Sequence, residues 1–254
     1  EGELDTMCPL LRERQKPPGE ADFSEYKDEN GFGNHGLSSQ LHDEDDLRKD
    51  MAVYYGMTSF MDQQIGRILD RLDELGIADN TLVVFTSDHG HFLGQHGLIA
   101  KAFMYEDNIR LPWLVRWPGK VAPGSSTDAF QCLVDLAPTF LAAAGLPAEG
   151  QMQGVDLTPI WIGERPAVRD HVICEHRHQP HRFTIRTYLN RRYKINLYRG
   201  QEWGELYDLE ADPGETRNRW DDPAYAEVKH RLMFEFLQAE MEREPTRMPR
   251  VWGA

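Results

Sequence analysis

The chain has 254 residues, of which 40% are hydrophobic and 28% are charged. This hydrophobic content can build a packed core and excludes wholesale disorder. The formal net charge of -14 repels phosphate backbones, which argues against nucleic-acid binding. No apolar run approaches the roughly 20 residues that span a bilayer, so no membrane partner is expected. The three cysteines lack disulfide or zinc-site spacing and mildly favour a reducing, cytoplasmic compartment.

The first part of the chain, residues 1 to about 43, is expected to be irregular. Pro17-Pro18-Gly19 interrupts it, Asn30-Gly31 is a further turn signal, and no hydrophobic period persists. Long irregular segments are uncommon inside compact domains. We therefore interpret these residues as a segment from the middle of a larger protein. They contain no signal peptide and leave the localisation unknown.

The range 44–165 is predicted to form an α/β layer. A helix is expected over about 45–75, because apolar residues recur there at three- and four-residue spacing. Short apolar runs at 81–86 and 113–117 predict strands, and a second helix is expected over about 135–144. Helix, strand, strand and helix in this order indicate a sheet sandwiched by helices, and we expect its strands to be parallel.

The range 166–254 has the pattern of a small α+β subdomain. Short runs with turn signals between them predict an antiparallel sheet with strands at 171–174, 183–188, 193–198 and 205–208. A C-terminal helix over about 223–242 is expected to pack on this sheet. Its apolar face is predicted to consist of Val228, Leu232, Phe236 and Leu237.

The loop after the 81–86 run carries the side chains most suited to chemistry. Asp88 and His89 directly follow the expected strand, and α/β sheets bind ligands outside the carboxyl ends of their strands. A carboxylate beside an imidazole is half of a divalent-metal site, although by spacing alone an ordinary turn is the more frequent outcome. Lys101 ends the glycine-rich loop that follows and can bring an ammonium group to an anion.

Together these motifs resemble the sulfatase family of the alkaline-phosphatase superfamily. The similarity covers roughly residues 44–235, in the order of the family's C-terminal half. The matching segments are Tyr54-Tyr55, Ile65-Gly66-Arg67, Asp79-Asn80-Thr81, Ser87-Asp88-His89-Gly90, Gly94-Gln95-His96-Gly97, Lys101, Arg110-Leu111-Pro112, Pro118-Gly119, Asp135-Leu136-Ala137-Pro138-Thr139, Leu206-Tyr207-Asp208 and Asp212-Pro213. The resemblance implies a sulfatase-like sheet sandwiched by helices, with a small C-terminal antiparallel subdomain.

The resemblance also implies a role for each matching residue. Asp88 and His89 correspond to one pair of the family's metal ligands, with Ca2+ as the expected ion and Mn2+ as the alternative. Lys101 corresponds to the lysine that contacts the sulfate oxygens and the nucleophile. His96 occupies a position close to the site, as a catalytic or substrate-contacting residue. His178, in a histidine-rich segment, is expected to border the substrate pocket.

Two parts of the family's site have no counterpart in this sequence. These are the first two aspartate ligands and the nucleophile, a formylglycine made from the first residue of a Cys/Ser-x-Pro-x-Arg motif. Cys8 and Arg12 have the spacing of that motif, but Pro9 lies one place early, so Cys8 is not expected to be the nucleophile. The N-terminal half of the same protein, or another chain, is expected to complete the site. Residues 1–254 alone are expected to be inactive.

The leading interpretation is a sulfuric ester hydrolase that acts on a small-molecule sulfate ester through a divalent metal and formylglycine. In that reaction Lys101 would offset negative charge in the transition state. A phosphonate monoester or phosphodiester hydrolase on the same scaffold is an alternative, because the metal ligands and the lysine suit both reactions. A non-catalytic remnant that serves as a binding module is a second alternative.

Overall fold

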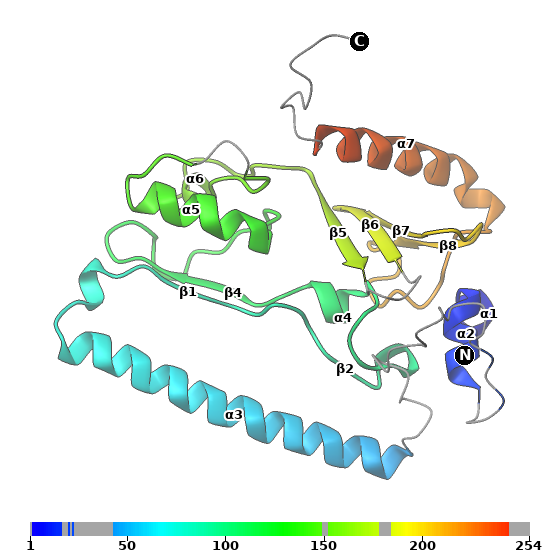
Figure 1. The fold of residues 1–254 in the computed structure, drawn as a ribbon, viewed down its shortest axis with the longest axis horizontal. Helices are drawn as coiled ribbons and strands as arrows, with labels where there is room; N and C mark the ends of the chain where they lie inside the picture. Colours follow the sequence, from blue (N-terminus) through cyan, green and yellow to red (C-terminus); the bar gives the residue numbers. More distant parts are fainter. Residues whose placement is uncertain are drawn as a thin grey trace, which may run out of the picture.

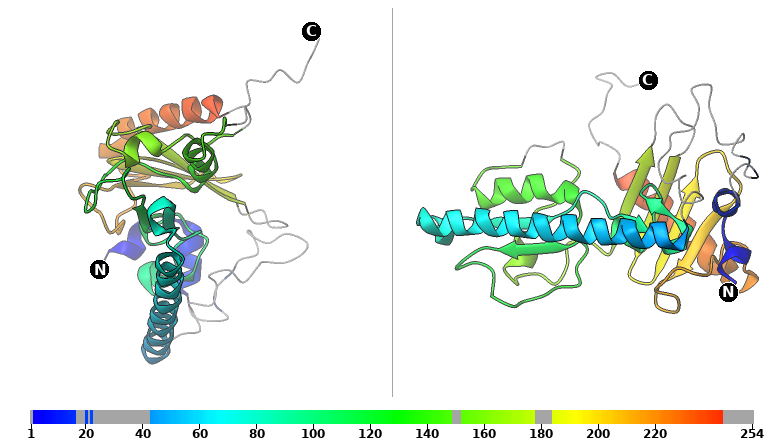
Figure 2. Two further views of the ribbon diagram at one scale, coloured as in Figure 1. Left: turned by 90° about the vertical axis from the view of Figure 1, so that its left-hand side faces the viewer. Right: turned by 90° about the horizontal axis from the view of Figure 1, so that it is seen from below.

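The structure is a computed structural model that describes residues 2–16, 20, 22, 43–148, 152–177 and 184–243. One lobe contains a two-stranded sheet between helices, and the other contains a four-stranded sheet with a helix along one face (Figure 1). The view from below, at the right of Figure 2, shows the same separation between the lobes.

The longest described helix, α3 (Glu44–Glu74), confirms the helix expected there. Asp43 caps its start by accepting a hydrogen bond from the backbone N–H of Asp46 at 2.8 Å. Gly76, at φ 67°, follows the last turn, where a left-handed residue commonly ends a helix. The apolar periodicity predicts a core face, but no residue of α3 is buried. Among the described helices, none combines the length and the hydrophobicity needed to cross a membrane.

Strand β1 (Val83–Thr86) pairs with β4 (Trp113–Arg116), which confirms both strands. The pairing is antiparallel, with Val84 opposite Val115, so the expected parallel arrangement is wrong for this pair. Parallel neighbours need a crossover, usually a long helix, that returns the chain to the same edge of the sheet. The connection here contains no such helix. Its elements are β2 (Phe92–Leu93), β3 (Ile99–Ala100) and α4 (Glu106–Ile109).

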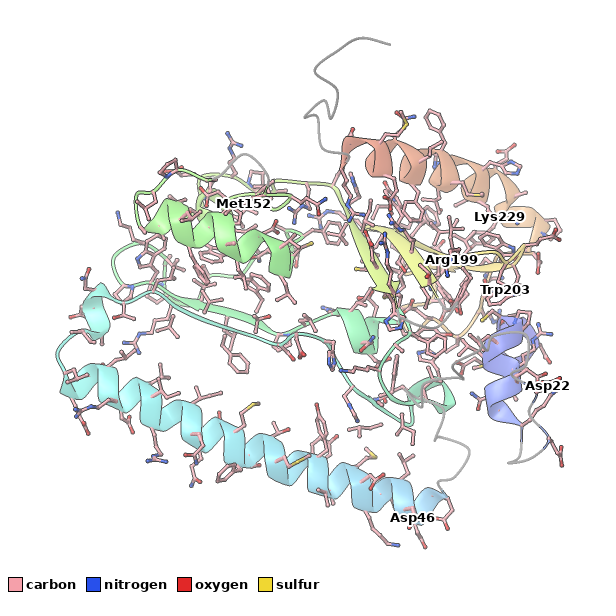
Figure 3. All side chains as sticks on the ribbon, viewed as in Figure 1. Asp22, Asp46, Met152, Arg199, Trp203 and Lys229 are labelled. Carbon is pink, nitrogen blue, oxygen red and sulfur yellow. The ribbon has the colours of Figure 1, made fainter. Side chains whose placement is uncertain are left out.

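Helices lie on both sides of the β1–β4 pair, which confirms the α/β layer. Helices α5 (Leu136–Ala143) and α6 (Thr158–Trp161) cover one side, and α3 runs along the other (Figures 1 and 2). The core on the α6 side includes Leu157, Ile160 and Trp161, against which Val84 and Val115 pack. On the α3 side, the helix side chains stand apart from the strands (Figure 3).

The second lobe confirms the predicted antiparallel sheet. Its strands pair in chain order and are β5 (His171–Arg177), β6 (Thr184–Asn190), β7 (Tyr193–Tyr198) and β8 (Gly204–Asp208). Helix α7 (Ala226–Glu242) packs on one face through Leu232 and Phe236, which are 0% and 3% exposed. The placement of Leu237 on that face is wrong, because it follows Phe236 by about 100° of helical rotation and is 58% exposed. Ala239 completes the buried face instead.

The opposite face of the sheet is covered by the N-terminal segment and by the loop that follows β1. Helices α1 (Glu3–Thr6) and α2 (Pro9–Gln15) show that the expectation of an irregular start is wrong for these residues. Leu10 and Leu11 of α2 are buried in one cluster with Phe92, Tyr105 and Ile185. Helices of one or two turns are too short to show a hydrophobic period, so pattern reading missed them.

Candidate active site

Asp88 and His89 lie in the loop that leaves β1 at Thr86, as the sequence predicted. The side chain of Asp88 is 81% exposed and that of His89 is 33% exposed. The Ser87 hydroxyl donates to the His89 carbonyl at 2.9 Å, and the His89 N–H donates to Asp88 Oδ1 at 3.0 Å. Slight burial acts to raise the pKa of Asp88, but the His89 N–H and the imidazole lower it overall. The carboxylate is therefore ionised at neutral pH and faces solvent.

The imidazole of His89 is held in one orientation by two contacts. Nδ1 lies 2.7 Å from the Gly90 carbonyl oxygen, which can only accept, so Nδ1 carries the proton. Nε2 then has a free lone pair, and Lys101 Nζ donates to it at 2.7 Å. The structure thus brings Asp88, His89 and Lys101 together, as the loop spacing indicated. His89 Nε2 also lies 3.2 Å from Asp88 Oδ2.

This pair of atoms suits two neighbouring ligands of one divalent ion. Ligands at right angles on bonds of about 2.3 Å lie about 3.3 Å apart, close to the observed separation of Asp88 Oδ2 and His89 Nε2. One carboxylate oxygen and one imidazole nitrogen are acceptable to Ca2+ or Mn2+. Within the described ranges, no group of three or more His, Cys, Asp or Glu side chains is placed to hold a metal. The two residues therefore fit half of a coordination shell.

Asp88, His89 and Lys101 lie in the wall of a wide depression between the two lobes. The wall carries more basic than acidic side chains, although the whole chain has a net charge of -14. The basic residues are Lys101, Arg110, Lys120, Arg169, Arg191 and Arg243, and the acidic residues are Asp88, Glu106, Asp128 and Glu175. Arg169 is paired with the buried Asp135, whereas no described ion pair involves Arg110 or Lys120. The depression therefore suits an anionic ligand.

His96 is not brought together with the other predicted site residues. Its side chain is 6% exposed and stacks on the Tyr105 ring at a centroid distance of 3.7 Å. Nδ1 lies 2.7 Å from Glu3 Oε1, and Nε2 lies 3.6 Å from Asp107 Oδ2. His96 is absent from the wall of the depression. Its position joins the N-terminal helices to the loop that carries Lys101.

The remaining candidates are a histidine outside the described ranges and three thiols. The prediction for His178 lies outside the described residues, so the structure places no atom of it. Cys8 is 2% exposed, and burial followed by the charge of Glu205 raises the pKa of its thiol, which suits a packing role. Burial also raises the pKa of Cys132 to about 11 and that of Cys174 to about 12.

Gly90 and Asn108 help to fix the site. The sequence analysis treated Gly90 as a loop glycine only and did not identify Asn108. A Cβ on Gly90 would lie 1.9 Å from the Asp107 carbonyl oxygen, so no larger residue fits. The Gly90 N–H donates to the Asn108 carbonyl at 2.8 Å, and Asn108 Nδ2 donates to the Phe103 carbonyl at 2.7 Å. Asn108 thereby ties the loop of His89 to the segment after Lys101. In the sequence, only the glycine at position 90 indicates that the backbone at Asp107 approaches this loop closely.

Comparisons with known proteins find sulfatase family models and sulfatase relatives. The family model described as "Sulfatase" matches residues 12–146, and the model "N-sulphoglucosamine sulphohydrolase, C-terminal" matches residues 94–242. The N-acetylglucosamine-6-O-sulfatase of Bacteroides thetaiotaomicron is 35% identical over 72% of this chain and 34% of its own length. The arylsulfatase of Clostridium perfringens is 30% identical over 71% of this chain and 38% of its own length. The chain thus spans about a third of the length of these curated relatives.

Two solved structures are similar in fold and sequence. One, in complex with its substrate D-glucosamine-2-N,6-O-disulfate, has a TM-score of 0.68 and 32% identity over 73% of this chain and 39% of that chain. The phosphonate monoester hydrolase from Silicibacter pomeroyi has a TM-score of 0.77 and 25% identity over 96% of this chain and 51% of that chain. Since the model described as "Sulfatase" matches residues 12–146, which is more than half of the chain, the chain belongs to the sulfatase family.

Proposed function

We propose that the protein is a sulfuric ester hydrolase and that this chain supplies one side of its active site. The observation that carries the proposal is the meeting of Asp88, His89 and Lys101 in one depression. Two of these side chains suit a divalent cation and the third suits an oxyanion. Family membership supports the sulfate ester as the substrate class.

In this proposal Asp88 Oδ2 and His89 Nε2 hold the cation, with Ca2+ expected and Mn2+ as the alternative. When bound, the cation supplies Lewis-acid polarisation of the sulfate group. Lys101 would place its ammonium group beside the sulfate oxygens and stabilise the charge that develops there. The Gly90 carbonyl keeps Nδ1 protonated, so the Nε2 lone pair remains available to the metal.

The substrate we propose is a sulfated sugar, with a sulfated glucosamine unit as the first candidate. The N-acetylglucosamine-6-O-sulfatase relative and the structure holding D-glucosamine-2-N,6-O-disulfate support this choice. The excess of basic side chains around the depression also supports it, because Arg110 and Lys120 are free to meet further sulfate or carboxylate groups. A localisation in the cytoplasm stays a proposal that rests on the small number of cysteines.

We further propose that a formylglycine nucleophile and the remaining metal ligands come from other residues of the same protein or from another chain. The partial coverage of the relatives supports this, as do the two-ligand site and the exposed apolar side chains of α3. Without a nucleophile, positioning and charge stabilisation give only residual catalysis. Residues 1–254 alone are therefore expected to show no measurable sulfatase turnover.

A phosphonate monoester or phosphodiester hydrolase is the second candidate. The similarity to the Silicibacter pomeroyi enzyme, with a TM-score of 0.77 over 96% of this chain, supports it. A cation and an ammonium group stabilise a phosphonate oxyanion as well as a sulfate oxyanion. Turnover of an aryl phosphonate at a higher kcat/KM than that of an aryl sulfate would favour this reading.

The experiment compares the full-length protein with its Lys101→Ala and Lys120→Ala variants on glucosamine-6-sulfate, an aryl sulfate and an aryl phosphonate. Lys101→Ala should lower kcat/KM by about 10²-fold, the scale of losing one preorganised transition-state contact. Lys120 lines the same depression but makes no described hydrogen bond or ion pair with Asp88, His89 or Lys101, so Lys120→Ala should act mainly on KM. Chelation should abolish turnover and Ca2+ or Mn2+ should restore it. Unchanged kcat/KM in Lys101→Ala would remove Lys101 from the mechanism, and a full-length protein inactive on all substrates would favour a binding module.

A further inference from the structure

Lys101 lies in a strained stretch of backbone. Its neighbours Ala100 and Ala102 have φ angles of 67° and 108°, which side chains with a Cβ rarely adopt. Such conformations cost roughly 1–3 kcal/mol each and persist only where the surrounding structure holds them. The ammonium group of Lys101 nevertheless meets His89 Nε2 at 2.7 Å. Contacts with residues outside the loop must therefore hold this segment in place.

The residues that follow Lys101 anchor the segment in the second lobe. Residues 102–105 are all buried, and Tyr105 is only 1% exposed. The hydroxyl of Tyr105 donates to Glu205 Oε1 at 3.2 Å and lies 3.3 Å from the hydroxyl of Tyr207. Both partners belong to β8, about a hundred residues further along the chain. The anchor thus crosses from the loop of the first lobe into the sheet of the second.

The carboxylate of Glu205 accepts the hydrogen bond from Tyr105 together with hydrogen bonds from three other side chains. It is 1% exposed, and it accepts hydrogen bonds from Tyr198 OH at 2.6 Å, Tyr207 OH at 3.0 Å and Asn196 Nδ2 at 2.8 Å. No ion pair to Glu205 is formed among the described side chains. A buried carboxylate without a cation is costly unless its oxygens are fully hydrogen-bonded. Undocking Tyr105 would remove one of its four donors, so the loop is held firmly.

A second link fixes the next residue. The backbone N–H of Glu106 donates to Glu215 Oε2 at 2.6 Å, and Lys194 Nζ reaches Glu106 Oε1 at 3.1 Å. Lys194 and Glu215 are 0% and 2% exposed. These contacts fix the far end of the segment. Nearer to Lys101, Asn108 Nδ2 holds the Phe103 carbonyl from within the same loop, whereas Tyr105 is the nearest side chain that donates a hydrogen bond to the second lobe. The hydroxyl of Tyr105 is therefore the contact through which the second lobe should act most directly on the lysine.

We propose that Tyr105 and Glu205 form a positioning pair, through which the C-terminal sheet holds the backbone of Lys101 at the place that the reaction needs. Neither residue touches the reacting atoms, so both act through Lys101. The catalytic consequence rests on the function proposed above, but the anchoring of the loop does not. The small sheet then has a role in the site beyond bordering it.

The test uses two matched variants of the full-length protein. Tyr105→Phe removes the hydroxyl that joins the Lys101 segment to Glu205. Tyr198→Phe removes another hydroxyl from the same carboxylate but leaves the segment attached. Each change deletes one oxygen atom and keeps a buried ring, so the two should have similar effects on global stability. Hydrogen exchange of the amides of residues 99–104 and steady-state kinetics are measured for both variants.

In Tyr105→Phe, exchange over residues 99–104 should rise about tenfold and kcat should fall about tenfold, the scale of one hydrogen bond to a charged group. KM should change by less than about twofold, because Lys101 acts mainly in the transition state. Tyr198→Phe should leave the exchange and kcat within about twofold of the unmodified protein. Equal exchange in the two variants would overturn the positioning pair. If the unmodified protein has no turnover, the proposed function fails while the exchange comparison still decides the anchoring.

Discussion

The two lobes differ in how completely they bury their apolar surface. In the C-terminal lobe, Leu206, Leu232 and Ile195 are all 0% exposed between the sheet and α7. In the other lobe, Phe60 and Ile68 of α3 are 65% and 62% exposed, although the helix has the same kind of apolar periodicity as α7. Side chains fill the space beneath α7, whereas most of those of α3 stand apart from the β1–β4 pair (Figure 3). Apolar periodicity therefore predicts which helix face can be buried, but a packing partner is needed to bury it.

The difference also explains why the proposed site is only half formed. A four-stranded sheet with a helix on it can be stable by itself, but a pair of strands is marginal without further partners. Asp88 and His89 follow β1, which belongs to the marginal pair. Lys101 is instead held by the closed lobe, through Tyr105. Substitutions in one lobe, each with a counterpart in the other, test whether the two lobes differ in how much buried contacts stabilise them.

The largest effect is expected at Lys194, whose ammonium lies in the closed lobe. It is 0% exposed and lies 2.5 Å from Glu215 Oε1, in an ion pair without hydrogen-bond geometry. Lys194→Met leaves two acidic groups without their cation and should lower the free energy of unfolding by about 3–5 kcal/mol in urea denaturation. Lys49→Met on α3, where the lysine is 73% exposed, should leave the urea midpoint nearly unchanged, because an exposed ion pair contributes little. Similar costs for the two variants would contradict the contrast between the lobes.

The next effect concerns the two apolar helix faces. Leu232→Ala empties a fully buried position on α7 and should cost about 3 kcal/mol. Ile68→Ala on α3 should cost less than about 0.5 kcal/mol in the chain of residues 1–254, because the side chain is already exposed. Thermal and urea unfolding measure both. A cost above about 2 kcal/mol for Ile68→Ala in the full-length protein would indicate that further residues cover α3.

A pH effect is expected from Glu215. Burial raises its pKa to about 7, although Lys194 acts to lower it. The folded state thus holds the proton more tightly than the unfolded state, where the pKa is about 4.3. The stabilisation from Glu215 is therefore complete below about pH 4 and is lost as the pH rises through about 7. Unfolding free energies of the unmodified chain and of Glu215→Gln should diverge over this window, and a pH-independent difference would refute the shifted pKa.

The smallest effect is expected at the start of α3. Asp43→Ala removes the side-chain acceptor for the Asp46 N–H and should destabilise the first turn by about 1 kcal/mol. Asp43→Asn keeps an acceptor oxygen and should cost a few tenths of that amount. Hydrogen exchange of the first-turn amides measures the change locally. Equal exchange in both variants would show that the cap does not contribute to the helix.

Local pattern was sufficient for most of the secondary structure. The 3.6-residue period located α3, and short apolar runs located β1, β4 and the four strands of the second lobe. The Asp88-His89-Gly90 motif also placed Asp88 and His89 directly after a strand. These features depend on residues close together in the chain. Short helices such as α1 and α2 were missed because one or two turns carry no readable period.

Long-range contacts decided everything that the pattern left open. The antiparallel pairing of β1 with β4 depends on the path of the connection between them, which local propensity does not specify. The burial of His96 against Tyr105, away from the depression, depends on α1 reaching it across the molecule. The anchoring of Lys101 depends on Glu205, about a hundred residues away. Local pattern identified the candidate site residues, whereas the tertiary structure shows which of them meet, because only packing brings distant side chains within hydrogen-bond distance.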